Sequence, residues 1–303
     1  MGSKNISSLL GQRLSALGRR HSLKLFAASL LLVPGLCFGA GKNVLIVNGS
    51  STTPETDTTN SVTTNLSADV AAAGGTVTVS DTIPANLSGY VQVWDVRWFN
   101  SAALSNSDIA QYVAYLLGGG TMFVVGENAL YGIRNNSVIA LVAAAGGGSL
   151  TYVVPLQTQT VLAPFTLPNP VSSIYYPAPG GAVGPSHPGT GAFMTLDTGN
   201  NGSGIWWTKG TLANAANGTL AVVFDPNFME ASADQLHFMT TSQAQNSQNF
   251  LNNLVAEFAQ ISGGSTPAAP IGTPALSEWG LILLGLLLVA LAARTLRTGP
   301  ALR

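Results

Sequence analysis

The stretch Gly118-Gly-Gly-Thr-Met-Phe-Val-Val-Gly-Glu-Asn128 decides the fold that this sequence predicts. The residues before it, 105–117, carry apolar side chains at helical spacing, and the three glycines end that helix. The apolar run 121–125 then has the length and side-chain content of a strand that is buried on both faces. A helix, a glycine stop and a fully apolar strand in direct succession indicate a parallel sheet covered by helices.

The same alternation extends in both directions along the chain. Further strands are expected at 44–47, 76–79, 90–98, 151–154 and 220–224. Further helices are expected at 62–73, 136–145 and 242–261. From Pro155 to Leu212 the alternation is lost in a Pro- and Gly-rich segment, which is expected to contain irregular strands or an inserted loop region. The predicted fold class is therefore α/β, a doubly wound, mostly parallel sheet with an irregular insertion.

The first forty residues have the organisation of a signal peptide. Basic residues and no acidic residue precede the apolar run 25–36, and Cys37-Phe-Gly-Ala40 supplies small residues for cleavage. The positive charge keeps this end on the cytoplasmic side while the apolar stretch inserts as a signal helix. A cleaved signal peptide over 1–40 is the prediction, and an uncleaved anchor is the alternative. Arg19-Arg20 leaves both Sec and twin-arginine export open.

The C-terminal end combines a linker with a short apolar helix. Residues 262–273 are rich in Gly, Pro, Ser and Thr, which predicts a flexible, extended linker. The apolar run 280–293 is expected to form a transmembrane helix, and the basic tail that follows suits the cytoplasmic side. Fourteen helical residues reach only about 21 Å, whereas the hydrocarbon core is about 30 Å thick. The short span favours a transient anchor over an ordinary tail anchor.

Between linker and helix stands Pro274-Ala-Leu-Ser-Glu-Trp279. This motif, followed by a short apolar helix and a basic tail, resembles the IPTL-CTERM protein-sorting family, whose hallmark is Pro-Thr-Leu-Ser-Glu-Trp. Only Ala275 departs from that pattern. The resemblance covers residues 274–303 and implies recognition by a membrane-embedded, exosortase-like enzyme that can remove the tail. It assigns the sorting motif to Pro274, Leu276, Ser277, Glu278 and Trp279.

Residues 41–261 are expected to form one exported α/β domain. This domain holds four basic and twelve acidic residues, a net charge of −8, whereas the whole chain has a net charge of only −1. Such a balance excludes nucleic acid as a partner. The single cysteine, Cys37, lies in the signal peptide, so the domain has no disulfide and no thiol nucleophile. Its two histidines exclude a zinc site of three histidines, and no cofactor motif is present.

The exported domain also resembles flavodoxin-like domains related to class I glutamine amidotransferases. It is more similar to the auxiliary domains found beside gliding-motility ABC transporters. The resemblance rests on the short first strand, the three glycines before the central strand, and Val222-Val-Phe-Asp-Pro-Asn-Phe228 before an Asn-rich helix. Any other doubly wound fold is the alternative. Because Glu127 or a neighbour stands where an amidotransferase has its cysteine nucleophile, that activity is not expected here.

Polar residues follow the predicted strand ends. In an open parallel sheet, ligands bind beyond the carboxyl ends of the strands. The candidate ligand-binding residues are Asn48, Arg97, Glu127, Asn128 and Asp225. Asp81 also follows a predicted strand end. Glu127 and Asp225 could bind a cation together with Asn128. The simpler interpretation is that the Asp and Asn side chains cap the helices that follow.

Three functions are therefore weighed. The favoured one is a non-enzymatic envelope or surface protein whose domain binds an unknown envelope partner or a glycan. The second is a hydrolase or carbohydrate-active enzyme that uses Glu127 and Asp225, with Trp206-Trp207 stacking on a sugar ring. The third is an exported cation-binding module. No catalytic residue and no metal ligand is assigned, because no nucleophile stands beside a base in the sequence.

Overall fold

The computed structural model describes residues 42–183, 189–230 and 239–263. The chain divides into two units, 1–263 and 264–303, and only the first contains described residues. The expected signal helix and the expected transmembrane helix at 280–293 therefore lie outside the described residues. Among the helices that are described, none combines the length and apolar character that crossing a membrane requires.

A seven-stranded sheet forms the centre of the first unit, in the order β2-β1-β3-β4-β13-β12-β9. Its parallel strands are β1 (Asn43–Val47), β2 (Thr76–Ser80), β3 (Gln92–Asp95), β4 (Thr121–Gly126) and β13 (Thr219–Phe224). The antiparallel strand β12 (Gly204–Trp207) and then β9 (Ala192–Phe193) extend the sheet beyond β13. All six residues of β4 and of β13 are buried, as expected of strands in the middle of such a sheet.

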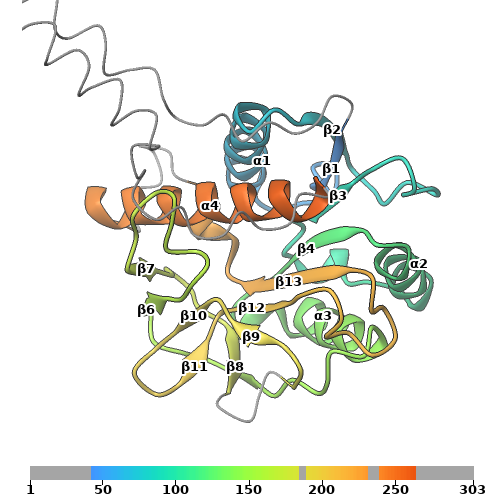
Figure 1. Ribbon diagram of the computed structural model, residues 1–303. Helices are drawn as coiled ribbons and strands as arrows, with labels where there is room; N and C mark the ends of the chain where they lie inside the picture. The colour runs from blue at the N-terminus through green and yellow to red at the C-terminus, as the bar shows by residue number, and fades with distance from the viewer. Residues whose placement is uncertain (1–41, 184–188, 231–238, 264–303) are drawn as a thin grey trace, which may run out of the picture. The chain divides into compact units, whose positions relative to one another are not determined.

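Helices cover both faces of the sheet (Figure 1). The helices α1 (Thr56–Ala72) and α4 (Thr241–Ser262) pack on one face, and α2 (Asn106–Leu117) and α3 (Gly132–Ala144) pack on the other. Alternate residues of one strand serve the two faces, because side chains alternate along a strand. In β1, Val44 and Ile46 belong to the core under α1 and α4, whereas Leu45 and Val47 belong to the core under α2 and α3.

The Pro- and Gly-rich segment forms short antiparallel strands, as the sequence predicted. One small sheet has the order β10-β6-β7 and another has the order β11-β8-β5. Their strands are β6 (Thr158–Val161), β7 (Ser173–Tyr175), β10 (Thr195–Leu196), β5 (Tyr152–Val153), β8 (Gly181–Val183) and β11 (Asn201–Gly202). In Figure 1 these strands lie beside one end of the central sheet.

The prediction that 151–154 continues the strand and helix alternation was wrong. Residues Tyr152–Val153 pair with β8 and do not join the central sheet, where β13 takes the place next to β4. The physical reason lies in burial. Both residues of β5 are half-buried and Val154 is 62% exposed, whereas a strand in the middle of the sheet must be covered on both faces.

Three short 3-10 helices follow strand ends, and they shape the edge where these strands finish. They are η1 (Asn100–Ala102), η2 (Ala129–Tyr131) and η3 (Pro226–Met229). The expected strand at 90–98 is shorter than predicted, since β3 ends at Asp95. After Asp95 the chain leaves the sheet. The loop residues Val96, Trp98 and Phe99 are buried in the core under α1 and α4.

Candidate functional site

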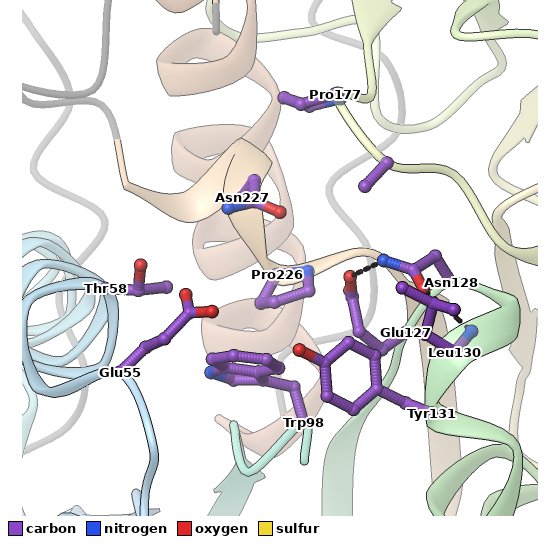
Figure 2. A pocket seen from close by; sticks show the side chains of 11 residues that line it. Glu55, Thr58, Trp98, Glu127, Asn128, Leu130, Tyr131, Pro177, Pro226 and Asn227 are labelled. Carbon is purple, nitrogen blue, oxygen red and sulfur yellow. Dashed lines mark hydrogen bonds between the residues drawn. The ribbon is translucent and has the colours of Figure 1, made fainter. Parts of the chain in front are cut away.

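The parallel strands end at one edge of the sheet, and a pocket of about 200 Å³ lies there. Its walls come from four connections that follow strand ends and from the Pro- and Gly-rich insertion. The lining residues are Glu55, Thr58, Trp98, Glu127, Asn128, Leu130, Tyr131, Pro177, Ala178, Pro226 and Asn227 (Figure 2). The position agrees with the general rule that ligands bind outside the carboxyl ends of strands in open α/β sheets.

Glu127 follows β4 directly and is only 3% exposed. Its Oε1 atom accepts a hydrogen bond from Asn128 Nδ2 at 2.7 Å, drawn as a dashed line in Figure 2. Its Oε2 atom is buried and has no hydrogen-bond partner among the described residues. Burial raises the pKa of Glu127 well above its usual value, and the charges of Asp225 and Glu55 add to that effect. One oxygen of this carboxyl group is therefore available at the pocket.

The backbone of Glu127 is held rigidly by Asn135 on α3. The Glu127 N–H donates to Asn135 Oδ1 at 2.7 Å, and Asn135 Nδ2 donates to the Glu127 carbonyl at 2.8 Å. The insertion approaches the same backbone, because a Cβ atom at Gly180 would lie 2.5 Å from the Glu127 carbonyl oxygen. The Gly180 N–H donates to the Phe224 carbonyl at 2.8 Å. Glycine at this position thus lets the insertion close one side of the pocket.

Asp225 lies below the pocket surface and is fully buried. Its Oδ2 accepts from the Ala178 N–H at 2.9 Å, and its Oδ1 accepts from the Asn227 N–H at 2.8 Å. Burial raises the pKa of Asp225 to about 7 against the opposing effect of these two backbone donors, and the charge of Glu230 adds to the rise. Because both of its oxygens are engaged, Asp225 shapes the turn and does not face a ligand.

The capping interpretation is confirmed for two of the candidate residues. Asp225 caps η3 through Asn227, and Asn128 Oδ1 accepts from the Leu130 N–H at 2.9 Å and caps η2. Asn128 nevertheless lines the pocket as well. Glu127 makes no such cap, so capping does not explain its carboxyl group.

Trp98 and Tyr131 form the aromatic wall of the pocket. Their ring centroids lie 5.0 Å apart at an interplanar angle of 78°, an edge-to-face arrangement. Trp98 is 4% exposed, and its Nε1 atom has no hydrogen-bond partner among the described residues. Figure 2 shows the indole nitrogen on the side of the ring nearest Glu55. The sequence reasoning missed Trp98, Tyr131 and Glu55, because Trp98 was placed inside the predicted strand 90–98, whereas β3 ends at Asp95.

Asn48 and Arg97 are not among the residues that line the pocket. Asn48 shapes the turn after β1, since its Oδ1 accepts from the Ser50 N–H at 3.2 Å. Arg97 Nη2 lies 2.6 Å from Asp95 Oδ2 and Arg134 Nη2 lies 3.2 Å from Asp95 Oδ1, forming a largely buried ionic network. Asp81, at the end of β2, accepts from the Ser51 N–H at 2.8 Å and serves the β1 turn in the same way. The structure thus brings together Glu127 and Asn128, with Asp225 beneath them.

Trp206 and Trp207 cannot form a sugar-stacking platform. Trp207 is fully buried in β12, and its Nε1 donates to the Gly147 carbonyl at 2.9 Å. Trp206 packs edge-to-face on Phe165 at a centroid distance of 4.9 Å. Neither residue lines the pocket. The paired platform was a wrong prediction because adjacent residues of a strand point to opposite faces, and the face that carries Trp207 is fully covered.

No group of three or more His, Cys, Asp or Glu side chains among the described residues is arranged to hold a metal ion. Of the acidic residues at the pocket, Glu127 and Asp225 are buried, Asp225 accepts from two backbone N–H groups, and Glu55 is exposed.

Comparison with known proteins identifies the tail. Residues 273–298 match the IPTL-CTERM motif, so this chain carries an IPTL-CTERM sorting motif at its C-terminus, as the Pro274–Trp279 stretch predicted. The motif indicates an exported protein that is sorted to the cell envelope and processed by an exosortase-type enzyme. A comparison with curated proteins finds no match.

Similar solved structures include the "mmIFT52 N-terminal domain", which is 11% identical. The match covers 75% of this chain and 100% of that domain with a TM-score of 0.50, and it shows likeness of fold alone. The exo-β-1,4-mannosidase Op5Man5 from Opitutaceae bacterium strain TAV5 matches at 10% identity and a TM-score of 0.43, over 68% of this chain and 34% of the enzyme. A β-galactosidase from Rahnella sp. R3 matches at 12% identity and a TM-score of 0.40, over 72% of this chain and 31% of the enzyme. The chain thus spans about a third of either glycosidase.

Proposed function

We propose that this protein is an envelope protein that displays a non-catalytic binding domain, with the pocket beyond β4 and β13 as its binding site. One observation carries the proposal. Two residues that line the pocket, Trp98 and Glu127, each have a buried polar atom, Nε1 and Oε2, without a hydrogen-bond partner among the described residues. Buried polar groups are almost always paired, so two such atoms in one pocket point to a ligand that pairs them.

The order of the parallel strands supports this location. The order β2-β1-β3-β4-β13 corresponds to that of flavodoxin-like, doubly wound sheets, in which the ligand site lies where the strand order reverses. In this chain the reversal lies between β1 and β3. The connections after these two strands supply Glu55, Thr58 and Trp98 to the pocket. The flavodoxin-like assignment itself remains part of the proposal.

A hydrolase that uses Glu127 and Asp225 is the second candidate. In its favour, the two carboxyl groups influence one another and both have raised pKa values, which is a pattern found in acid–base sites. Against it, both oxygens of Asp225 are bonded to backbone N–H groups and the residue is fully buried. Asp225 therefore cannot act on a substrate together with Glu127.

A pocket-filling variant tests the proposed function. Ala178 lines the pocket, and Ala178→Trp places an indole in a space of about 200 Å³ while leaving the Ala178 N–H free to bond Asp225. Full-length protein in nanodiscs is expected to sediment saturably with isolated envelopes of the producing cell. The variant should bind at least about tenfold more weakly. Equal binding of the two proteins would show that the pocket is not the binding site.

The control variant is Thr64→Ala, an exposed change on α1 away from the pocket lining. It should bind like wild type, which separates pocket filling from general damage. The hydrolase candidate is tested on the same envelope fragments. Sustained release of products by wild type that is lost in Glu127→Gln would establish that candidate over simple binding.

A further inference from the structure

The two unpaired atoms of the pocket define the chemistry of what it binds. Among the described residues, Arg134 Nη2, Trp98 Nε1 and Glu127 Oε2 are buried side-chain atoms without a hydrogen bond. Of these, Arg134 Nη2 has an ionic partner in Asp95, so the network under β3 accounts for it. Trp98 and Glu127 line one pocket, and the two residues are 4% and 3% exposed. They are the groups that a ligand must satisfy.

The two groups have different hydrogen-bonding capacities. An indole N–H is a donor only, whereas a carboxyl group accepts when ionised and both donates and accepts when protonated. A ligand group facing Trp98 must therefore accept a hydrogen bond, and one facing Glu127 must donate or accept. A hydroxyl group does both, because it has one donor hydrogen and two acceptor lone pairs. An ammonium group accepts no hydrogen bond and leaves Trp98 unpaired.

The charges around the pocket exclude an anionic ligand. Glu55 and Glu127 line it, and Asp225 is close enough to raise the pKa of Glu127. The nearby cations Arg97 and Arg134 are held by Asp95. A carboxylate or phosphate on the ligand would add negative charge beside acidic groups in a partly desolvated space. The ligand group that enters the pocket is thus not an anion, and the acceptor that Trp98 requires rules out an ammonium group in contact with it.

The shape of the pocket limits the size of that group. Its volume of about 200 Å³ is smaller than the range of about 300–1,000 Å³ typical of drug-sized ligands. The apolar part of the wall is formed by four ring side chains, those of Trp98, Tyr131, Pro177 and Pro226. At the rim stands Leu130, whose side chain is 83% exposed. This combination fits one saturated ring that carries hydroxyl groups on its edge and presents C–H groups on its faces.

Resting on the proposed binding function, we propose that the pocket binds a neutral sugar ring, such as the terminal residue of an envelope glycan. In this arrangement one hydroxyl oxygen accepts from Trp98 Nε1. A hydroxyl group hydrogen-bonds Glu127 Oε2, and the ring lies against the aromatic wall. The protein acts as a glycan-binding module, and no bond of the sugar is broken.

Three matched probes test the ligand class. Full-length protein in nanodiscs is titrated with glucose, glucosamine and glucuronate, which share one ring and differ in charge, with intrinsic tryptophan fluorescence and saturation-transfer NMR as readouts. We expect glucose to bind at least about tenfold more tightly than glucuronate and more tightly than glucosamine. Trp98→Phe keeps the aromatic wall and removes the N–H, and should weaken glucose binding about tenfold. Glu127→Gln should retain most of the affinity, whereas Glu127→Leu should lose it.

Each contrary result has a distinct meaning. Tightest binding of glucosamine or glucuronate would overturn the neutral-sugar inference. Equal binding by Trp98→Phe and wild type would overturn the role of the indole N–H. If none of the sugars binds while Ala178→Trp still abolishes envelope association, the sugar inference fails and the proposed binding function stands. If Ala178→Trp also binds envelopes normally, both fail.

Discussion

Asp95 is a buried carboxylate that is held by two arginines and a tyrosine. It is fully buried at the end of β3, it contacts two arginines, and it accepts from the Tyr112 hydroxyl at 3.0 Å. Burial alone would raise the pKa of Asp95, but the charges of Arg134 and Arg97 lower it to about 2. The network fixes the β3 end, from which Trp98 reaches the pocket. Arg97 therefore supports the site without contacting a ligand.

Replacing the Asp95 carboxylate should lower the free energy of unfolding substantially. In Asp95→Asn two buried guanidinium groups lose their counter-charge, and breaking such a buried pair costs about 3–5 kcal/mol. Urea denaturation followed by circular dichroism measures the change. The exposed Asp57→Asn, on α1, serves as the control and should change the free energy of unfolding far less. A similar effect of both variants would contradict the structural role of Asp95.

The buried carboxyl groups at the pocket make stability depend on pH. Burial raises the pKa of Asp225 to about 7, whereas an aspartate in an unfolded chain titrates near about 4. Between these values the folded protein keeps a proton that the unfolded chain has lost. The contribution of Asp225 to stability is therefore full below about pH 4 and falls as the pH rises through 7, by at most about 1.4 kcal/mol per pH unit. Burial likewise raises the pKa of Asp69 to about 6, in the same direction.

Unfolding at several pH values tests this prediction. The free energy of unfolding of wild type should decrease between pH 5 and pH 7.5. Asp225→Asn cannot titrate and should show a shallower slope, whatever its absolute stability, while Thr64→Ala, which removes no titratable group, should keep the wild-type slope. A wild-type protein that gains stability over this interval would show that Asp225 is ionised throughout.

At the scale of elements, two of the four helices that flank the sheet, α2 and α4, begin with side-chain caps. Ser105 accepts from the Asp108 N–H at 3.2 Å, and Asp108 Oδ2 accepts from the Ser105 N–H at 2.9 Å, so α2 starts in a capping box. Thr240 and Gln243 start α4 in the same way. Both pairs satisfy N–H groups that the first helical turn leaves without partners.

Removing one cap should cost a moderate and measurable amount of stability. Ser105→Ala deletes the hydroxyl acceptor at the start of α2, and the loss of a serine N-cap typically costs about 1 kcal/mol. Thr64→Ala lies on the exposed surface of α1 within the helix and removes no cap. Urea unfolding curves of the two variants should separate by about that amount. Superimposable curves would mean that the Asp108 carboxylate alone suffices as a cap.

At the scale of the whole molecule, the chain joins an acidic exported domain to a sorting tail. The tail motif lies at residues 273–298, and the basic residues outside 41–261 lie in the two ends. We expect the sorting enzyme to read Glu278 and Trp279 at the outer face of the membrane and to cut there. The domain would then leave the membrane with its net negative charge.

A double substitution tests the tail in native cells. Glu278→Ala with Trp279→Ala removes the recognised side chains and leaves the apolar run 280–293 unchanged. The variant should accumulate in the inner membrane as a precursor of full mass, while wild type is processed and moves to the envelope fraction. Cell fractionation measures the location of each protein, and mass spectrometry of the intact protein measures whether the tail has been removed. Ala275→Thr, which restores the family's residue, is the matched control and should be processed like wild type. Equal mass and distribution of the double variant and wild type would show that the tail is only an anchor.

Much of the fold could be predicted from the sequence because local signals agree with it. The apolar runs around Val44, Phe123 and Val222 are too hydrophobic to lie anywhere but in the middle of a covered sheet, and glycines mark the helix ends. The sorting tail was also readable, since its motif, apolar run and basic end are contiguous. Local patterns of this kind need no knowledge of distant partners.

Only the tertiary structure decided which residues share the pocket. Trp98, Glu127 and Pro177 are far apart in the sequence, and they meet because parallel strands end at one edge and the insertion folds back over that edge. The same folding brought Arg134 of α3 to Asp95 of β3 and buried Trp207, which looked available in the sequence. Sequence determines what each segment buries. The pairing of buried charges and the exposure of a side chain depend on contacts between distant segments, which no local pattern encodes.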